Sequence, residues 1–196
     1  GKNKINIQGS LLHEFTLKID ENYKLIDYDY KSGGNISESQ IFLKEPFRTS
    51  FIEKSIRKIS INKTNLEINL NKKKNFLTLN GLYNVRGLEN KKFKLTYYFN
   101  QKNSKYFIDF DLSENIFLES INFRTNLKNK SNIKSEFNFL NNNIIFKNIN
   151  FTEGKNSISI NKLKLNKKNE IVSISDVSVL TFNNNKENNN FKIFFK

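Results

Sequence analysis

The stretch NSISINKLKLNKKNEIVSISDVSV, from Asn156 to Val179, alternates apolar and polar residues almost without a break. A period of two predicts β-strands with one apolar face, because successive side chains of a strand point to opposite sides of the sheet. The spacing i, i+2, i+5, i+7 occurs twice, at Ile158, Ile160, Leu163 and Leu165 and again at Val172, Ile174, Val177 and Val179. The extra residue midway predicts a β-bulge near Asn161–Lys162 and another near Ser175–Asp176, each of which bends the sheet.

The same alternation recurs along most of the chain. Segments 93–99 (FKLTYYF) and 106–112 (YFIDFDL) flank a turn-like NQKNSK, which predicts a hairpin. Further hairpins are predicted around Glu21–Asn22, around NKKK at 71–74 and around 141–143. The predicted fold class is all-β: an elongated, curved antiparallel sheet of successive hairpins, either an open groove or an incompletely closed sandwich.

Two segments depart from the strand pattern. Residues 51, 52, 55 and 56 share one helical face, and Ser50 with Glu53 has the spacing of a capping box. At most one short helix near 50–58 is therefore predicted, with an irregular crossing after Pro46 as an equal alternative. Gly33–Gly34 fits neither a phosphate loop nor a dinucleotide fingerprint, and we interpret it as a turn.

The chain is predicted to be one β-rich unit followed by a short tail. Residues 1–182 form the single repeat-like segment, the Asn-rich 183–190 form a loop or linker, and 191–196 begin a next strand. No methionine is present, even at position 1, and we expect the chain to be a segment of a longer protein. No window approaches the run of about 20 apolar residues that a transmembrane helix needs.

The chain is strongly basic, with a net charge of +14 over 196 residues. Such a surface attracts phosphate through counterion release. Yet Lys, Asn, Ile and Phe, the dominant residues, all have AT-rich codons, and only four basic residues are arginines: Arg48, Arg57, Arg86 and Arg124. Genome composition can therefore produce the charge. A nucleic-acid-binding domain is kept as a less favoured alternative, and no nucleic acid is expected as a partner.

Residues that carry enzyme chemistry are few. His13 is the only histidine and cysteine is absent, so the chain cannot supply a His-pair metal site or a thiolate. The pairs Asp27/Asp29 and Asp109/Asp111 alternate with apolar neighbours, which places the carboxylates on a polar outer face. We predict no enzyme, no catalytic residue, no metal site and no cofactor.

The apolar face itself is the remaining candidate site. By default it packs against a second sheet, as in a structural or adhesin-like β-sandwich. The alternative is an open trough whose interior carries lipid acyl chains. The predicted lipid-contacting residues are Phe93, Leu95, Tyr97, Phe99, Ile108, Phe110, Phe137, Phe139, Ile158 and Ile160.

The order of these segments resembles a known family. Residues 23–47, 56–70 (IRKISINKTNLEINL), 76–85 (FLTLNGLYNV) and 149–182, which include the phrase FTEGKNS, are similar to the strand-rich middle region of AsmA-like proteins of the YhdP and TamB group. The resemblance implies the periplasmic part of a bacterial envelope protein held by an inner-membrane anchor outside this segment. It further implies a hydrophobic β-groove that carries or supports transfer of phospholipid between the inner and outer membranes and contributes to envelope integrity. The implied partners are phospholipid acyl chains, neighbouring β segments of the same longer chain, and envelope membrane proteins.

Overall fold

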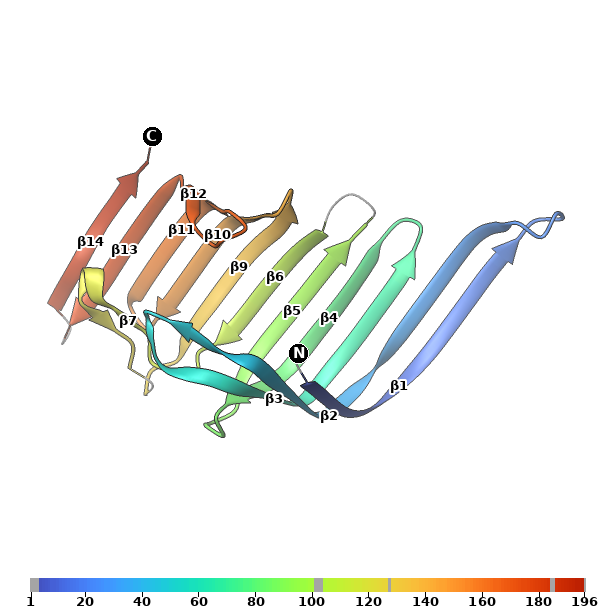
Figure 1. Ribbon diagram of the computed structural model, residues 1–196, viewed down its shortest axis with the longest axis horizontal. Helices are drawn as coiled ribbons and strands as arrows, with labels where there is room; N and C mark the ends of the chain where they lie inside the picture. Colours follow the sequence, from blue (N-terminus) through green and yellow to red (C-terminus); the bar gives the residue numbers. More distant parts are fainter. Residues whose placement is uncertain (1–3, 101–103, 127, 184–185, 196) are drawn as a thin grey trace.

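The computed structural model describes residues 4–100, 104–126, 128–183 and 186–195. Within these ranges, twelve strands form one antiparallel sheet whose outermost strands, β1 and β14, do not meet (Figure 1). The strands of this sheet are β1 (Lys4–Ile19), β2 (Leu25–Thr49), β3 (Ile52–Asn71), β4 (Asn75–Val85), β5 (Lys91–Phe99), β6 (Ser104–Asp111), β9 (Ser131–Leu140), β10 (Asn143–Glu153), β11 (Asn156–Leu165), β12 (Ile171–Ser173), β13 (Asp176–Asn183) and β14 (Lys186–Phe194). The predicted curved, all-β sheet of successive hairpins is confirmed.

Strand order follows the sequence, because almost every strand pairs with the one before it. The predicted hairpins join β1 to β2, β3 to β4, β5 to β6 and β9 to β10, although residues 101–103 of the third turn lie outside the described residues. The exception is β6, which pairs with β9 across a long excursion of the chain. The short β12 pairs with β11 beside β13.

A row of irregularities bends the first three strands. The β1–β2 register shifts between Gln8 and Gly9. Ser37 of β2, which lies opposite this shift, is paired with no residue of β1 or of β3. In β3 the register shifts between Asn62 and Asn65, where Lys63 has a φ of 46°. Bulges of this kind increase local twist. Beyond the row, residues 38–62 form a hairpin end, here called the arm, which curves across the front of the sheet in Figure 1.

The excursion between β6 and β9, residues 112–130, is here called the insert. It contains β7 (Phe117–Leu118), the 3₁₀ helix η1 (Glu119–Ile121) and β8 (Phe123–Arg124). An isolated bridge joins Ile52 of the arm to Ile116, and the Phe117 amide donates to the Phe51 carbonyl oxygen at 3.0 Å. The insert therefore supports the tip of the arm.

The insert also carries most of the small core. Its residues Leu112, Ile116 and Phe123 are buried together against Phe151 of β10, and the Phe123 and Phe151 rings meet edge to face at 5.7 Å. At its far side, Asn189 of β14 donates from Nδ2 to the Ile121 carbonyl oxygen at 2.9 Å. The insert thus links the arm to the last strand of the sheet.

The short helix that the sequence allowed near 50–58 does not form. Ser50 and Phe51 form the turn at the tip of the arm, and Ile52 already begins β3. Cross-strand pairs, Phe47 with Ile56 and Thr49 with Ile52, override the helical spacing of this short run. The alternative of an irregular crossing is met only in part: the β2–β3 pairing is interrupted between Phe42 and Phe47, but β2 continues through Pro46 to Thr49.

Two other predictions of irregular structure are also wrong. Gly33–Gly34 lies inside β2, not in a turn, and a Cβ on Gly34 would stand 2.1 Å from the Ser10 carbonyl oxygen of β1. The glycine is needed because the two backbones approach so closely. Within 183–190, Asn183 ends β13 and residues 186–190 belong to β14 of the same sheet, while 184–185 lie outside the described residues.

Both positions of the predicted bulges are irregular, but the β10–β11 register does not shift at Asn161–Lys162, and a strand break replaces the bulge near Ser175–Asp176. In β11, Lys162 has a φ of 51°, and this returns Leu163 to the face that Ile160 occupies. The second irregularity is stronger than a bulge, because the strand is interrupted between Ser173 and Asp176.

Candidate functional site

Cross-strand pairing aligns the apolar residues of the sheet into rows. Residues opposite each other share a face, so the register defines which side chains lie together. One row joins Leu66, Leu79, Leu95 and Ile108, and a second joins Ile68, Leu77, Tyr97, Tyr106, Phe137, Phe146 and Leu163. These rows form one apolar surface across the sheet, here called the trough face.

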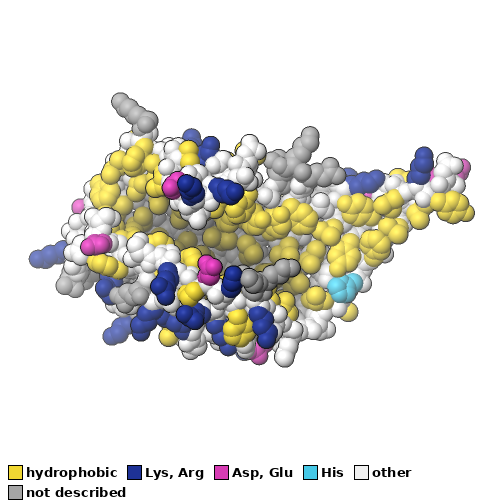
Figure 2. All heavy atoms as spheres, in the orientation of Figure 1, with side chains coloured by type: hydrophobic (Ala, Val, Ile, Leu, Met, Phe, Trp, Pro, Cys, Tyr) yellow, Lys and Arg dark blue, Asp and Glu magenta, His cyan; other side chains and the backbone are white. Residues whose placement is uncertain are grey.

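The trough face is concave and largely uncovered. Figure 2 shows apolar side chains lining a hollow, with Lys and Arg side chains along its margins. The two-stranded β7–β8 sheet of the insert packs on one end of this face, and among the described residues only eight apolar residues are buried: Ile56, Val85, Leu112, Ile116, Phe123, Phe151, Leu163 and Val179. The arm and the insert border it along one side. A closed sandwich, the default for such a face, is not formed by this part of the chain.

The ten residues predicted to contact lipid all lie on this face. Phe93 is opposite Phe110, Leu95 is opposite Ile108, and Ile158 and Ile160 lie on β11. Nine of the ten are half-buried, and Phe139 is 48% exposed. Phe110 and Ile158 also pack against the core cluster of the insert, so they contribute to the core as well as to the trough face.

Sequence reasoning missed the contribution of the first four strands. Leu77 and Leu79 of β4 continue the rows, as do Leu66 and Ile68 of β3. Their alternation was visible in the sequence, but the register that joins them to β5 and β6 was not. Exposed apolar residues of β1, including Phe15 at 63%, extend the surface to the sheet edge.

A stack of aromatic rings crosses the middle of the trough face. The Tyr97 and Tyr106 rings lie 4.4 Å apart at 14°, and Tyr106 and Phe137 lie 5.0 Å apart at 8°. Phe146 continues the series at 5.2 Å from Phe137. Burial, together with the hydrogen bond to Tyr97, raises the pKa of the Tyr106 hydroxyl, which keeps it neutral at physiological pH. The Tyr97, Tyr106 and Phe137 rings form a flat aromatic platform, and Phe146 is tilted by 40° at its end.

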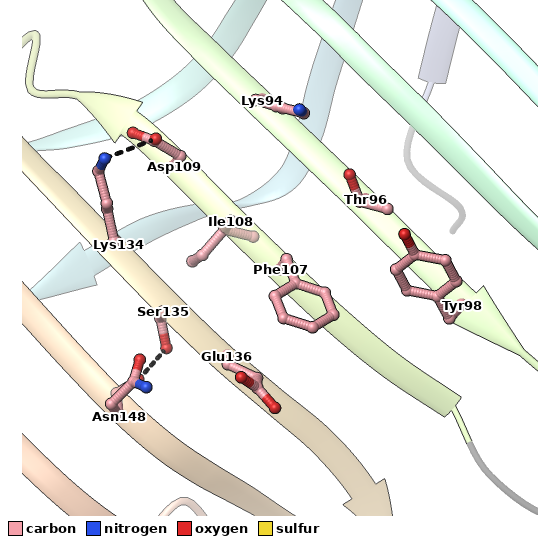
Figure 3. Close-up of a pocket in the computed structure, with 10 residues that line it drawn as sticks. All are labelled: Lys94, Thr96, Tyr98, Phe107, Ile108, Asp109, Lys134, Ser135, Glu136 and Asn148. Carbon is pink, nitrogen blue, oxygen red and sulfur yellow. Dashed lines mark hydrogen bonds and ion pairs between the residues drawn. The ribbon is translucent and has the colours of Figure 1, made fainter.

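The opposite face of the same strands is polar. A depression of about 450 Å³ lies there. Figure 3 shows the residues that line it, which include Lys94, Thr96, Asp109 and Glu136. Lys134 pairs with Asp109 at 3.2 Å. Burial acts to raise the pKa of Asp109, but hydrogen bonds from Asn132 and Lys134 outweigh it and hold that pKa below its ordinary value.

This polar face has the character of a solvated surface with paired charges. Glu136 is paired with Lys105 at 2.6 Å and with Lys147 at 3.4 Å. Asp29, predicted to lie on the outer face, pairs with Lys31 at 3.0 Å. Within the described ranges, no three His, Asp or Glu side chains are grouped so that they could hold a metal ion.

Comparison with protein-family models, with curated proteins and with solved structures found no match to this chain. No helix among the described residues has the length and apolar character needed to span a bilayer.

Proposed function

We propose that this chain is a non-catalytic module that binds lipid acyl chains along its trough face. The observation that carries the proposal is the open sheet, whose concave apolar surface stays uncovered over most of its strands, although the insert covers Phe110, Phe151 and Ile158 at one end. Monomeric proteins rarely leave large contiguous apolar patches exposed unless these are binding surfaces. Each methylene that leaves water for such a surface contributes about 0.8 kcal/mol, so an acyl chain needs no specific polar contact to be held.

The biological setting that we propose rests on the resemblance to AsmA-like proteins. In this setting the chain is a periplasmic segment of an inner-membrane-anchored protein, and phospholipid slides along the trough between the two membranes. The open, elongated shape of the sheet is consistent with such a passive path. Neighbouring β segments of the same protein, and other envelope proteins, would then be its partners.

The proposal is tested by extracting the purified protein with solvent and measuring copurified phospholipid by mass spectrometry. The test variant is Leu79→Lys/Leu95→Lys, a directly opposed pair on the trough face of β4 and β5. The matched control is Thr78→Lys/Thr96→Lys, the adjacent opposed pair of the same two strands on the polar face. Both variants add two lysines to the same strands, so net charge and position are held constant.

We expect phospholipid in the parent and in the control, and a loss of most of it in the test variant while circular dichroism still reports a folded sheet. The same amount of lipid in both folded variants would contradict the proposal. A well-folded parent without lipid, even after incubation with phospholipid vesicles, would favour a purely structural β module.

A further inference from the structure

The trough face contains one polar cluster at its β1–β2 end. His13 of β1 is directly opposite Ser32 of β2, and the next position along β2 on the same face is Tyr30. His13 Nδ1 and the Tyr30 hydroxyl oxygen are 2.9 Å apart, and the two rings are stacked with centroids 6.0 Å apart. Figure 2 shows the histidine on the same side of the molecule as the apolar hollow.

Ser32 carries an unsatisfied hydroxyl in this cluster. The residue is only 3% exposed, and its Oγ has no hydrogen-bond partner. A buried hydroxyl without a partner costs free energy, and native structures seldom keep one without a reason. Its cross-strand neighbours on the trough face are His13 on one side and Ile68 on the other.

Two side chains of the cluster, His13 and Ser32, have a proton left to donate to an incoming oxygen, because the single Tyr30 hydroxyl proton is used toward His13 Nδ1. When the Tyr30 hydroxyl donates to Nδ1, the ring proton of His13 is on Nε2, which makes no hydrogen bond to any described group. The Ser32 hydroxyl has a free proton as well, but its oxygen is closed to solvent in this structure, so a ligand oxygen reaches it only when a neighbouring side chain moves. No Asp or Glu side chain takes part in the contacts among these three residues, so nothing in the cluster repels a negative charge.

We propose that His13 and Ser32, with Tyr30 orienting the His13 ring, bind the anionic oxygen headgroup, carboxylate or phosphate, of an amphiphile whose acyl chain lies on the trough face. This inference rests on the proposed acyl-chain binding and adds the class and position of the headgroup. From Ser32, the same row leads through Ile68, Leu77 and Tyr97 to the aromatic platform. An apolar surface with a few convergent polar groups is the usual composition of a site that fixes a ligand's orientation.

The test measures displacement of N-phenyl-1-naphthylamine, a neutral dye that fluoresces in apolar surroundings. The competitors are decanoate, decyl phosphate and decanol, which have the same tail and differ in the headgroup. The variants are Ser32→Ala and His13→Phe/Ser32→Ala. The control is Ser39→Ala, which removes another buried serine of β2, on the far side of the bend.

We expect the ratio of anion affinity to decanol affinity to fall about tenfold in the double variant, equivalent to about 1.4 kcal/mol. It should fall less in Ser32→Ala and stay unchanged in Ser39→Ala. Whether decanoate or decyl phosphate loses more identifies the headgroup. Ser32→Ala removes only an unpartnered hydroxyl, so its thermal midpoint should not fall, and this single variant decides the test if the double variant does not fold.

Two different failures are distinguishable. If the dye binds and decanol competes, but the anion preference is the same in parent and variants, the headgroup site is overturned while acyl-chain binding stands. If neither dye nor decanol binds the folded parent, the proposed function fails and the headgroup site fails with it.

Discussion

Replacing Gly81 with alanine should strongly destabilise the sheet, because this glycine faces the bulge that bends β3. A Cβ built on Gly81 would lie 2.0 Å from Thr64 Oγ1 and 2.7 Å from Thr64 Cα. Thr64 is fully buried, and its hydroxyl already donates to the Asn62 carbonyl oxygen at 3.0 Å. The side chain therefore has no free direction in which to move.

The size of the effect follows from this geometry. Ordinary contact begins at 3.4 Å, so the alanine Cβ would have to gain about 0.7 Å from Thr64 Cα and about 1.4 Å from Thr64 Oγ1, which requires the β3 and β4 backbones to separate at this point. Overpacking of this kind costs about 1–3 kcal/mol. Stretching the two neighbouring ladder hydrogen bonds adds about 1 kcal/mol each. We expect Gly81→Ala to lower the free energy of unfolding by about 3–5 kcal/mol.

The assay is urea denaturation followed by circular dichroism, with Gly33→Ala as the control. Gly33 lies in the middle of β2, and the nearest atom to a Cβ there is the Leu66 carbonyl oxygen at 3.9 Å. That substitution should be neutral or stabilise by up to about 1 kcal/mol, through the lower entropy of the unfolded chain. Equal midpoints for Gly81→Ala and the parent, or a loss in Gly33→Ala as large as in Gly81→Ala, would refute the reasoning.

Three further predictions concern the core, the bulges and the charged face. Phe123→Ala should cost about 3–5 kcal/mol in denaturant unfolding, because it empties the contact with Phe151 beneath the insert; a loss below about 1 kcal/mol would show that the cluster is not a core. Lys63→Gly and Lys162→Gly should each raise the thermal midpoint and increase the free energy of unfolding by about 0.5–1 kcal/mol, since both lysines have positive φ. A lower midpoint would mean that contacts of the lysine side chains stabilise these irregular positions. Burial acts to raise the pKa of Glu136, but its lysine partners lower it below the ordinary 4.5, so its stabilisation is present above that pH and is lost as pH falls through the depressed value. Glu136→Gln should therefore flatten the stability profile on the acid side of pH 4.5, measured by thermal melts, and an unchanged acid slope would contradict this.

How far the sequence predicts this fold depends on the range of the interactions. Alternation along 93–99 and 106–112 predicted strands, faces and hairpins correctly, because those properties are local. The arm and the insert were not predictable in this way. The bridge between Ile52 and Ile116 joins positions far apart in sequence, and no periodicity encodes it.

Composition misled the prediction in the Asn-rich end of the chain. Asparagine favours turns when its side chain bonds to the local backbone. In β14 the Asn189 side chain instead donates to Thr181 Oγ1 at 2.8 Å and to the insert. For the candidate site, the alternation of apolar and polar residues along each strand placed all ten predicted residues on one face. The polar cluster at His13 could be identified only from the β1–β2 register.

The sequential strand order has a consequence for how this molecule can change in evolution. Each hairpin contacts chiefly its two neighbours, so the sheet behaves as a one-dimensional array and not as a closed globule. A hairpin duplicated or deleted away from the insert changes the length of the array by two strand spacings, about 9–10 Å, and leaves the remaining pairings intact. Length is therefore a property that insertion and deletion can tune without redesigning a core.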